Sequence, residues 1–290
     1  MPKLRIGIAT CDKFPDLSAD DQLFSSELVK LRVAAAPVIW DDENVEWGNF
    51  SCVVIRSCWD YHRKPDEFLA WLDLLEQNNV NVWNPVSALR GNMRKTYLRD
   101  LQARGIAVVP TEFLNRGDDA ALADVLERRD WKSAVVKPDI SASSFQTRLV
   151  ARENAGTEQA YFQQLLNGSG VMVQPFLPEV AARGEWSFVF IDGEFSHAAL
   201  KRPKAGDFRV QDDFGGSQVL ETPSPSLLQN AAAIAACIPE PWLYARVDGV
   251  EIDGVFTLME LELIEPSLFL LLEPRSAERL ARATLRRVSS

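Results

Sequence analysis

Short apolar runs alternate with segments of helical periodicity over the first ninety residues. The runs LRIGIAT, PVIW and CVVIRS are strand candidates, whereas residues 18–36 and 65–78 have the apolar spacing of helices. Because strand and helix alternate, the pattern predicts a parallel sheet in a small α/β unit that spans residues 1–90. The second helix would turn five apolar side chains toward that sheet: Phe68, Leu69, Trp71, Leu72 and Leu75.

The pattern changes at Gly91 and predicts a second unit at residues 91–173. Helices are expected at residues 93–104 and 119–128, with a glycine ending the first of them. Strands are expected between and after these helices, at residues 106–111, 134–139 (AVVKPD) and 145–150 (FQTRLV).

The remaining residues, 174–290, read as a third unit of strands closed by helices. An extended segment follows Pro175, and a hairpin turns at Asp192-Gly193. A flexible stretch, residues 212–216, precedes a helix at residues 226–237. A last helix at residues 275–288 carries five arginines, which we interpret as a solvated face near a helix C-terminus: Arg275, Arg279, Arg282, Arg286 and Arg287.

Residues 244–267, YARVDGVEIDGVFTLMELELIEPS, combine apolar and charged positions in what reads as a β-hairpin around Asp253-Gly254. A two-residue turn would pair Asp248 with Met259 and turn Glu260 and Glu262 to the opposite face, because side chains alternate along a strand. That register mixes apolar and charged residues on both faces of the hairpin.

A three-residue loop at residues 252–254 would instead pair Val247 with Met259 and Arg246 with Glu260. One face then becomes apolar and the other charged, so we favour this register. It brings three carboxylates within reach of one or two hard cations such as Mg²⁺: Asp248, Glu260 and Glu262. The alternative is an exposed polar face with ordinary ion pairs.

Composition narrows the class of protein. The 290 residues carry a net charge of −10, which argues against a general nucleic-acid role because polyanion binding needs clustered Lys and Arg. No apolar run approaches the roughly 20 residues that span a bilayer, so we expect a cytoplasmic protein without a membrane partner. The four cysteines form no CxxC pair and the two histidines stand far apart, which favours neither a zinc site nor a disulfide framework. We expect His197 to be structural.

Two loops carry candidate recognition chemistry. At the end of CVVIRS, the planar guanidinium of Arg56 can bind a carboxylate at two points, and the Trp59 ring can pack against a ligand. The alternative is an ion pair between Arg56 and Asp60 that caps the strand. Lys137 leaves an apolar strand beside the small-residue loop at residues 141–144, an arrangement that suits phosphate. The alternative is that Lys137 is a surface lysine next to a turn, without a ligand.

Taken in order, these motifs resemble the ATP-grasp fold over nearly the whole chain. They are similar to the glutathione-synthetase-like branch and, within it, to the cyclo-ligase of D-cycloserine biosynthesis, an O-ureido-serine cyclo-ligase. The resemblance implies an α/β fold with α+β lids, in which a Rossmann-like pre-ATP-grasp domain precedes the ATP-grasp domains. It lies in the segments RSCWDY, KTYLRDL, VVKP, VQPFLPEV, GEWSFVFIDGEFSHAALKRP and ELELIEPSLFL.

The resemblance implies ATP and Mg²⁺ as cofactors and assigns residues to them. The ATP-binding positions would be Lys95 and Lys137 at the phosphates, with Ser143, Gln174, Phe176, Leu177, Glu179 and Glu185. The Mg²⁺ ligands would be Asp248, Glu260 and Glu262, although the last position is commonly Asn in glutathione synthetases. The residues around the transferred phosphate would be Arg246, Arg209 and Lys201. The substrate-binding residues would be Arg56, Trp59, Asp60, Tyr61, Arg202, Gly215, Gly216 and Ser267.

The chemistry implied is an ATP-dependent ligase that converts a carboxylate into an acylphosphate and joins it to a nitrogen nucleophile. The substrate would be small and amino-acid-like, the enzyme an intramolecular cyclo-ligase or a carboxylate–amine ligase, and the resemblance is compatible with a homodimer. A nucleotide-binding regulator that has lost catalysis is the alternative. The serine-rich loop at residues 141–144 departs from the glycine-rich loop usual in the family.

Overall fold

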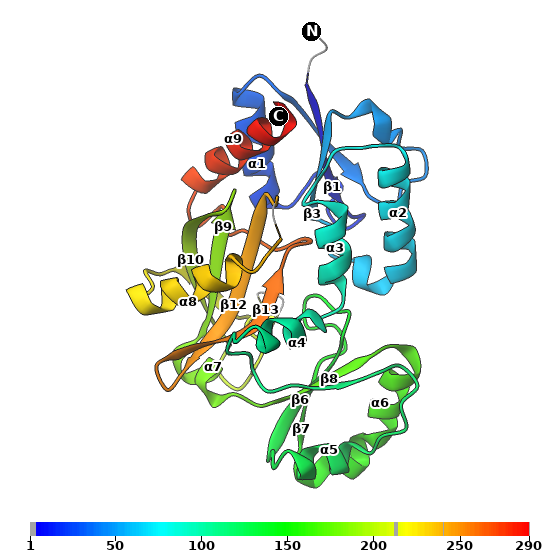
Figure 1. The fold of residues 1–290 in the computed structure, drawn as a ribbon, viewed down its shortest axis with the longest axis vertical. Helices are drawn as coiled ribbons and strands as arrows, with labels where there is room; N and C mark the ends of the chain where they lie inside the picture. Colours follow the sequence, from blue (N-terminus) through cyan, green and yellow to red (C-terminus); the bar gives the residue numbers. More distant parts are fainter. Residues whose placement is uncertain (1–3, 212–213, 240, 290) are drawn as a thin grey trace.

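The computed structural model describes residues 4–211, 214–239 and 241–289, and its strands form three sheets (Figure 1). The N-terminal sheet is parallel, with the order β2-β1-β3-β4, which confirms the predicted α/β arrangement. Its strands are β1 Arg5–Thr10, β2 Ala34–Ile39, β3 Cys52–Ser57 and β4 Val82–Trp83. Its helices are α1 Ala19–Lys30 and α2 Pro65–Gln77, with the short 3₁₀ helices η1 Trp47–Asn49 and η2 Tyr61–Arg63.

Helix α1 is shorter than the helix predicted at residues 18–36. Ser18 caps its N-terminus by accepting a hydrogen bond from the Asp21 backbone N–H at 3.2 Å. The helix ends at Lys30, and Arg32 has a positive φ of 63° before the chain enters β2. The alanines at residues 34–36 favour a helix on their own, but pairing with β1 draws them into the sheet.

Two helices occupy the region where a single helix was predicted at residues 93–104. They are α3 Val86–Met93 and α4 Tyr97–Ala103, and Arg94 between them is extended, with φ −95° and ψ 125°. The Lys95 backbone N–H donates to the Asp139 carbonyl at 2.9 Å, which holds this break in place. Lys95 therefore lies in the link between two helices and not on a helix.

The middle sheet is antiparallel, with the order β5-β8-β6-β7. The strand predicted at residues 106–111 is wrong: Val108 forms only an isolated bridge with Leu258, and the sheet strand begins at Glu112. Pro110 lacks the N–H that a continuous ladder would need. The elements are β5 Glu112–Leu114, α5 Leu122–Arg128, β6 Ser133–Pro138, β7 Arg148–Ala151, η3 Arg152–Asn154, α6 Ala155–Gly168 and β8 Val171–Pro175.

The third sheet is antiparallel, with the order β11-β10-β9-β12-β13, and α8 packs across its central strands (Figure 1). The segment predicted to stay extended after Pro175 instead forms a short helix, α7. The elements are α7 Pro178–Arg183, β9 Glu185–Ile191, β10 Glu194–Arg202, β11 Ser217–Leu220, α8 Pro225–Ala235, β12 Tyr244–Ile252 and β13 Val255–Glu262.

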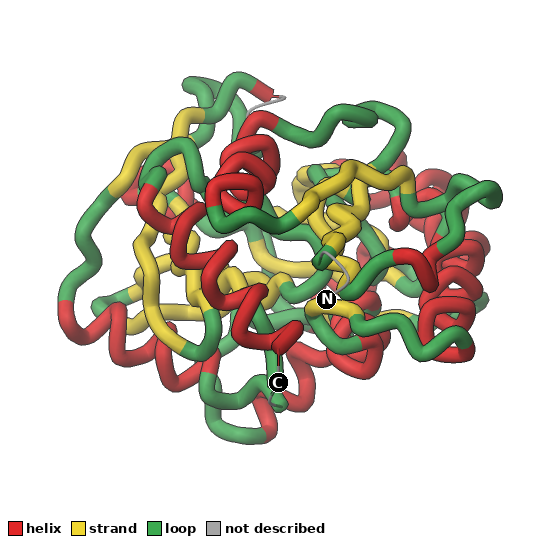
Figure 2. The backbone as a smooth tube through the Cα atoms, turned by 90° about the horizontal axis from the view of Figure 1, so that it is seen from above, coloured by secondary structure: helices red, strands yellow, loops and turns green. Residues whose placement is uncertain are grey.

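The C-terminal helix α9, Arg275–Ser289, joins the first and third sheets. It packs beside α1, and side chains from α9, α1, β1 and β9 share one hydrophobic core (Figures 1 and 2). Its arginines are not simply solvated, because Arg286 and Arg287 bind Asp192 at 2.7 and 2.8 Å in the β9–β10 turn. The division at residues 90 and 173 stays a prediction.

No helix in the described part of the chain is both long and apolar enough to cross a membrane.

Candidate active site

The β12–β13 hairpin combines features of both predicted registers, and neither prediction is fully correct. Its turn has two residues, Asp253 and Gly254, both with positive φ (50° and 80°), and Ile252 pairs with Val255. A bulge then shifts the register between Asp248 and Gly249, so that Asp248 lies opposite Glu260.

The bulge produces the acidic face that the three-residue loop was meant to explain. With one extra residue in β13, the pairs Asp248–Glu260 and Arg246–Glu262 follow the Gly249–Leu258 pair. Glycine at position 249 is required by space, because a Cβ there would lie 2.5 Å from the Thr257 carbonyl oxygen. The sequence offered no signal for a bulge at this point.

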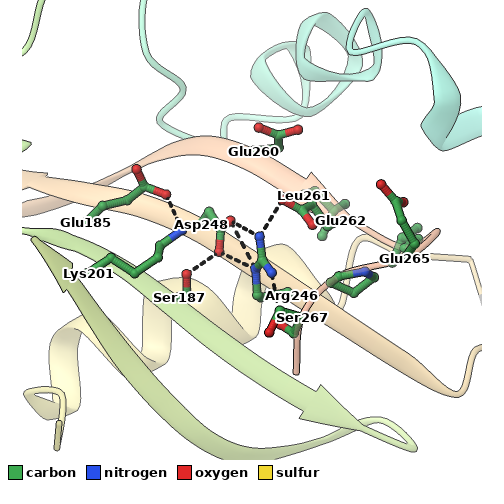
Figure 3. Close-up of polar contacts among 12 residues, drawn as sticks. Glu185, Ser187, Lys201, Arg246, Asp248, Glu260, Leu261, Glu262, Glu265 and Ser267 are labelled. Atoms are coloured by element: carbon green, nitrogen blue, oxygen red, sulfur yellow. Dashed lines mark hydrogen bonds and ion pairs between the residues drawn. The ribbon is translucent and has the colours of Figure 1, made fainter. Parts of the chain in front are cut away.

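Arg246 lies at the centre of the charged face (Figure 3). Its guanidinium donates to Asp248 at 2.8 Å, to Glu262 at 2.5 Å and to the Ser267 carbonyl at 2.9 Å. Ser187 donates to the second oxygen of Asp248 at 2.6 Å. Burial opposes the charge on Arg246, but the carboxylates outweigh burial and raise the pKa of its guanidinium.

Two lysines complete this network from other strands and loops. Lys201 on β10 contacts Glu185 at 2.6 Å and Asp248 at 3.4 Å, and Lys95 contacts Glu260 at 2.7 Å. Lys137 on β6 faces the same cavity and makes no ion pair or hydrogen bond with the described residues. Burial lowers the pKa of Lys137, so its ammonium is poorly satisfied in this state.

The acidic groups respond differently to this environment. Burial raises the pKa of Glu262 to about 8, since Arg246 is shared with Asp248 and the neighbouring carboxylates add repulsion. Glu265 behaves likewise, with burial as the main cause of a pKa of about 7. The pKa values of Asp248 and Glu260 are lowered despite burial, because Arg246 and Lys95 lie beside them.

A cavity of about 820 Å³ is lined by strands of the second and third sheets and by segments that follow β1 and β3 of the first. Its polar groups include the charged face of the hairpin, and its apolar wall comes from the β8 end and the lid loop at residues 141–147. The predicted site residues that line it are Trp59, Asp60, Tyr61, Lys95, Lys137, Ser143, Gln174, Phe176, Leu177, Glu185, Lys201, Arg209, Arg246, Asp248, Glu260, Glu262 and Ser267.

Arg56 does not line the cavity, which overturns its predicted role as a fork for a substrate carboxylate. The side chain is 1% exposed and donates to Asp21 at 2.8 Å and to the Pro266 carbonyl at 2.7 Å. The alternative pair with Asp60 is also wrong, because Asp60 accepts a hydrogen bond from the Trp40 indole at 2.8 Å. Arg56 ties β3 to α1 and to the segment after β13.

Four further predicted residues lie outside the cavity lining: Glu179, Arg202, Gly215 and Gly216. Arg202 is exposed at the end of β10. Gly216 has a packing role, because a Cβ there would lie 2.1 Å from the Val210 carbonyl oxygen. Asp212 and Asp213 of the predicted flexible stretch lie outside the described residues.

The predicted carboxylate trio does not form a ready metal site. No group of three or more His, Cys, Asp or Glu residues among residues 4–211, 214–239 and 241–289 is arranged to hold a metal ion. The carboxylates are paired instead with Arg246 and Lys201 (Figure 3) and with Lys95.

The lid loop holds its shape without glycine. Ser143, Ser144 and Gln146 have φ values of 49°, 56° and 49°, the left-handed conformation that glycine adopts most easily. The Lys95 ammonium donates to the Ser141 carbonyl at 2.6 Å, which ties the loop to the charged face. The loop therefore keeps a glycine-like conformation with serine side chains directed around the cavity rim.

Sequence reasoning missed several residues that line the cavity. They include the loop after β1 at residues 11–14, His62 on η2, Phe145 in the lid loop and Glu265 after β13. The position of residues 11–14 follows from a rule for parallel sheets, in which ligand sites form beyond the strand C-termini. For His62 and Phe145, no local pattern indicated that the two would meet across the cavity.

Together, the three-sheet architecture and the charged hairpin in its central cavity define an ATP-grasp ligase. The solved D-alanine–D-alanine ligase from Bacillus anthracis superposes with a TM-score of 0.72 at 16% identity over 98% of this chain and 97% of its own, a likeness of fold. The crystal structure of D-cycloserine synthetase DcsG superposes with a TM-score of 0.88 at 30% identity, covering 98% of this chain and 99% of that chain.

Sequence comparisons agree with the structural ones. Residues 6–84 match the family described as D-cycloserine synthetase DcsG, N-terminal domain. The cycloserine biosynthesis protein DcsG of Streptomyces lavendulae is 33% identical over 263 residues, which cover 86% of this chain and 87% of that protein. Glutathione synthetase of Prochlorococcus marinus (strain MIT 9313) is 32% identical over 68% of this chain and 60% of its own length.

The chain belongs to the DcsG family of ATP-grasp enzymes and is an ATP-dependent ligase. This confirms the fold and the enzyme class that its motifs indicated, and it does not favour the regulator without ligase activity.

Proposed function

We propose that this ligase forms an amide-type C–N bond on a small amino-acid-like substrate through an acylphosphate, using ATP and Mg²⁺. The observation that carries the proposal is the charged face of the hairpin: three carboxylates and three paired cations lie in one cavity beside the unpaired Lys137. Such a site suits a polyanion that binds together with a metal cation, such as ATP with Mg²⁺. The family relationship supports the same chemistry.

The nucleotide would lie between the lid loop and the end of β8. We assign its phosphates to Lys137 and Lys95, its base to residues 174–177, and contacts along the rim to Ser143. Gln174 is already oriented, because its amide donates to the Thr111 hydroxyl at 2.9 Å. Glu185 and Lys201, which form one ion pair, would border the same site.

Magnesium fits the donor chemistry of the carboxylates. Asp248, Glu260 and Glu262 offer the oxygen ligands that hard cations prefer, and the raised pKa of Glu262 reflects buried negative charge that the present cations do not fully neutralise. When bound, Mg²⁺ supplies charge neutralisation to the phosphate oxygens. Its binding would require Lys95 and Arg246 to release carboxylate oxygens.

When Mg²⁺ binds the carboxylates, the side chains of Lys95 and Arg246 would need new partners. Lys95 and Arg246 lie on the carboxylates in this state, and they are positioned to turn toward phosphate oxygens once those carboxylates bind a cation. They would stabilise the charge that develops as a phosphoryl group moves to the substrate carboxylate. The lid loop and Phe145 would keep water from hydrolysing the acylphosphate.

The substrate would occupy the cavity end formed by the N-terminal unit. Trp59, Asp60 and Tyr61 follow β3 there, Ser267 follows β13, and Arg209 reaches the rim. We expect a compact zwitterion at this end. Since one cavity holds both ends, a substrate that carries carboxylate and nucleophile together would cyclise.

The test is ADP release by the full chain with Mg²⁺ and candidate substrates. The panel comprises both enantiomers of O-ureidoserine and the free amino acids, with hydroxylamine added in parallel to trap any acylphosphate as a hydroxamate. ADP and hydroxamate formed in equal amounts, dependent on one substrate, would support the proposal. Absence of any substrate-dependent hydroxamate across the panel would contradict the acylphosphate route.

A further inference from the structure

We infer that His62 contacts the attacking nitrogen of the substrate and takes up its proton as the C–N bond forms. The inference rests on the proposed function, since it assigns a role in the second half of the same reaction. It starts from the position of the side chain: His62 is 7% exposed and lines the cavity beside Tyr61 and Arg63.

The imidazole of His62 is unsatisfied. Both ring nitrogens are buried, and neither has a hydrogen-bond partner among the described residues. A buried polar group without a partner destabilises the fold, so most buried polar groups have one. A ligand in the cavity would supply the missing partner.

The second histidine of the chain shows the usual arrangement. His197 is also buried, but its Nε2 lies 2.9 Å from the Leu268 carbonyl oxygen and its Nδ1 lies 3.0 Å from the Ser196 hydroxyl. His197 does not line the cavity, in agreement with the structural role expected for it. The same fold thus ties one imidazole into its hydrogen-bond network and leaves the other, at the cavity, without a partner among the described residues.

The surroundings of His62 favour the neutral form, which can accept a proton. Burial is the main cause that lowers its pKa to about 4, and the nearby cations Arg63 and Lys95 act in the same direction. Asp60 and the Trp59 backbone oppose them more weakly, and the Asp60 carboxylate is hydrogen-bonded to the Trp40 indole. His62 lines the same cavity as Lys95, whose ammonium contacts Glu260 at 2.7 Å.

The lid loop covers this imidazole. The Phe145 ring lies 4.8 Å from the His62 ring between centroids, and the Arg63 guanidinium lies 5.6 Å from the Phe145 ring centroid. Residues of the N-terminal unit and of the lid loop therefore meet at His62. A proton acceptor at this junction is shielded from bulk water when the lid loop is in place.

In the second half of the reaction, a C–N bond replaces the C–O bond to phosphate. The nitrogen lone pair attacks the acylphosphate carbonyl, the C–N bond forms, and the C–O bond to phosphate breaks with its electron pair leaving on the phosphate oxygen. The N–H proton passes to the free ring nitrogen of His62 and then to the departing phosphate. A weak base suffices, because the nitrogen becomes acidic as it gains positive charge.

The test separates the two halves of the reaction in the full chain. Wild type and His62→Gln are assayed with ATP, Mg²⁺ and the substrate that gives hydroxamate, with and without hydroxylamine. We expect His62→Gln to keep hydroxamate formation within about threefold and to lose amide formation by about 100-fold or more, the usual scale of general-base catalysis. In His62→Ala, added imidazole should restore part of the amide-forming rate.

The matched control is His197→Gln, which should change both products by the same factor, because it affects the fold and not one step. Equal loss of both products in His62→Gln, or no loss of either, would overturn the inference. A wild type that forms no hydroxamate with any substrate would overturn the proposed function and this inference with it, whereas an unaffected His62 variant in an active enzyme would overturn the inference alone.

Discussion

The two ends of the cavity handle their polar groups in opposite ways. At the hairpin end, Arg246, Lys95 and Lys201 are paired with carboxylates at 2.5–2.8 Å, and almost every charge has a partner. At the N-terminal end, Arg56 does not line the cavity. It forms a buried ion pair with Asp21 instead. The lining at that end combines His62, whose ring nitrogens have no partner among the described residues, with aromatic side chains and four charged residues: Asp12, Lys13, Asp60 and Arg63.

This difference suggests that the hairpin end stabilises charge during the reaction and that the N-terminal end positions the substrate. At the hairpin end, lysine and arginine side chains are paired with carboxylates. In our proposal they exchange these partners when a nucleotide binds with its metal ion. At the N-terminal end, Lys13 and Arg63 lie over the rings of Phe14 and Phe145, so we expect recognition there to depend more on shape and on single hydrogen bonds. A charge removed from the first end should abolish chemistry, whereas a charge removed from Arg56 should weaken the fold.

The largest effect is expected from Glu260→Gln at the hairpin end. The change keeps side-chain volume but removes the negative charge that pairs with Lys95 and, in our proposal, binds Mg²⁺. We expect turnover to fall by about 10³-fold or more with the fold intact, as measured by ADP release and circular dichroism. Glu251→Gln is the matched control, because Glu251 lies on the same hairpin outside the cavity. Turnover close to wild type at limiting Mg²⁺ would refute the assignment.

Arg56→Lys tests the other end. Lysine keeps the charge but loses the fork that serves both Asp21 and the Pro266 carbonyl, so we expect the unfolding free energy to fall by about 3 kcal/mol. Urea unfolding measures this change, and KM for the substrate should stay within about twofold because the side chain does not line the cavity. A large rise in KM without loss of stability would restore the substrate role that the structure argues against.

Lys137→Ala should weaken ATP binding. The ammonium is poorly satisfied without a ligand, so its removal costs the free protein little and the complex more. We expect the Kd for ATP to rise by about 10- to 100-fold, equivalent to about 1.4–2.7 kcal/mol. Isothermal titration calorimetry measures it, with Lys132→Ala as the control because Lys132 is exposed before β6. Unchanged affinity would count against a phosphate contact.

Sequence reasoning succeeded where one local rule governs the outcome. The parallel sheet followed from alternating periodicity, and the acidic strand of the hairpin followed from Glu260 and Glu262 two residues apart. Family motifs brought Lys95, Lys137 and the hinge near residues 174–177 into one cavity. These features depend on order along the chain, which a sequence displays directly.

The failures share a different cause, which is pairing between distant residues. Arg56 and Asp21 are 35 positions apart, and nothing local favours Asp21 over the nearer Asp60. The helix predicted at residues 93–104 breaks at Arg94, where the Lys95 backbone N–H donates to the Asp139 carbonyl just after β6. The bulge beside Gly249 likewise depends on packing against Phe256 and Thr257. Such choices are decided by tertiary contacts that local patterns do not encode.

The pH dependence of stability sharpens the comparison at the boundary between the two ends, where Glu265 lies. Burial raises the pKa of this carboxyl to about 7, above its value of about 4.5 in an unfolded chain. Its favourable contribution to stability is therefore present below about pH 4.5 and is lost as pH rises through about 7. We expect Glu265→Gln, which cannot ionise, to lie within about 1 kcal/mol of wild type near pH 5 and to exceed its unfolding free energy by up to about 3 kcal/mol at pH 8. Urea unfolding at the two pH values measures the difference, and the exposed Glu221→Gln provides the control. A variant less stable than wild type at pH 8 would mean that Glu265 is ionised and held by a cation of the hairpin end, which would make it part of the charged face.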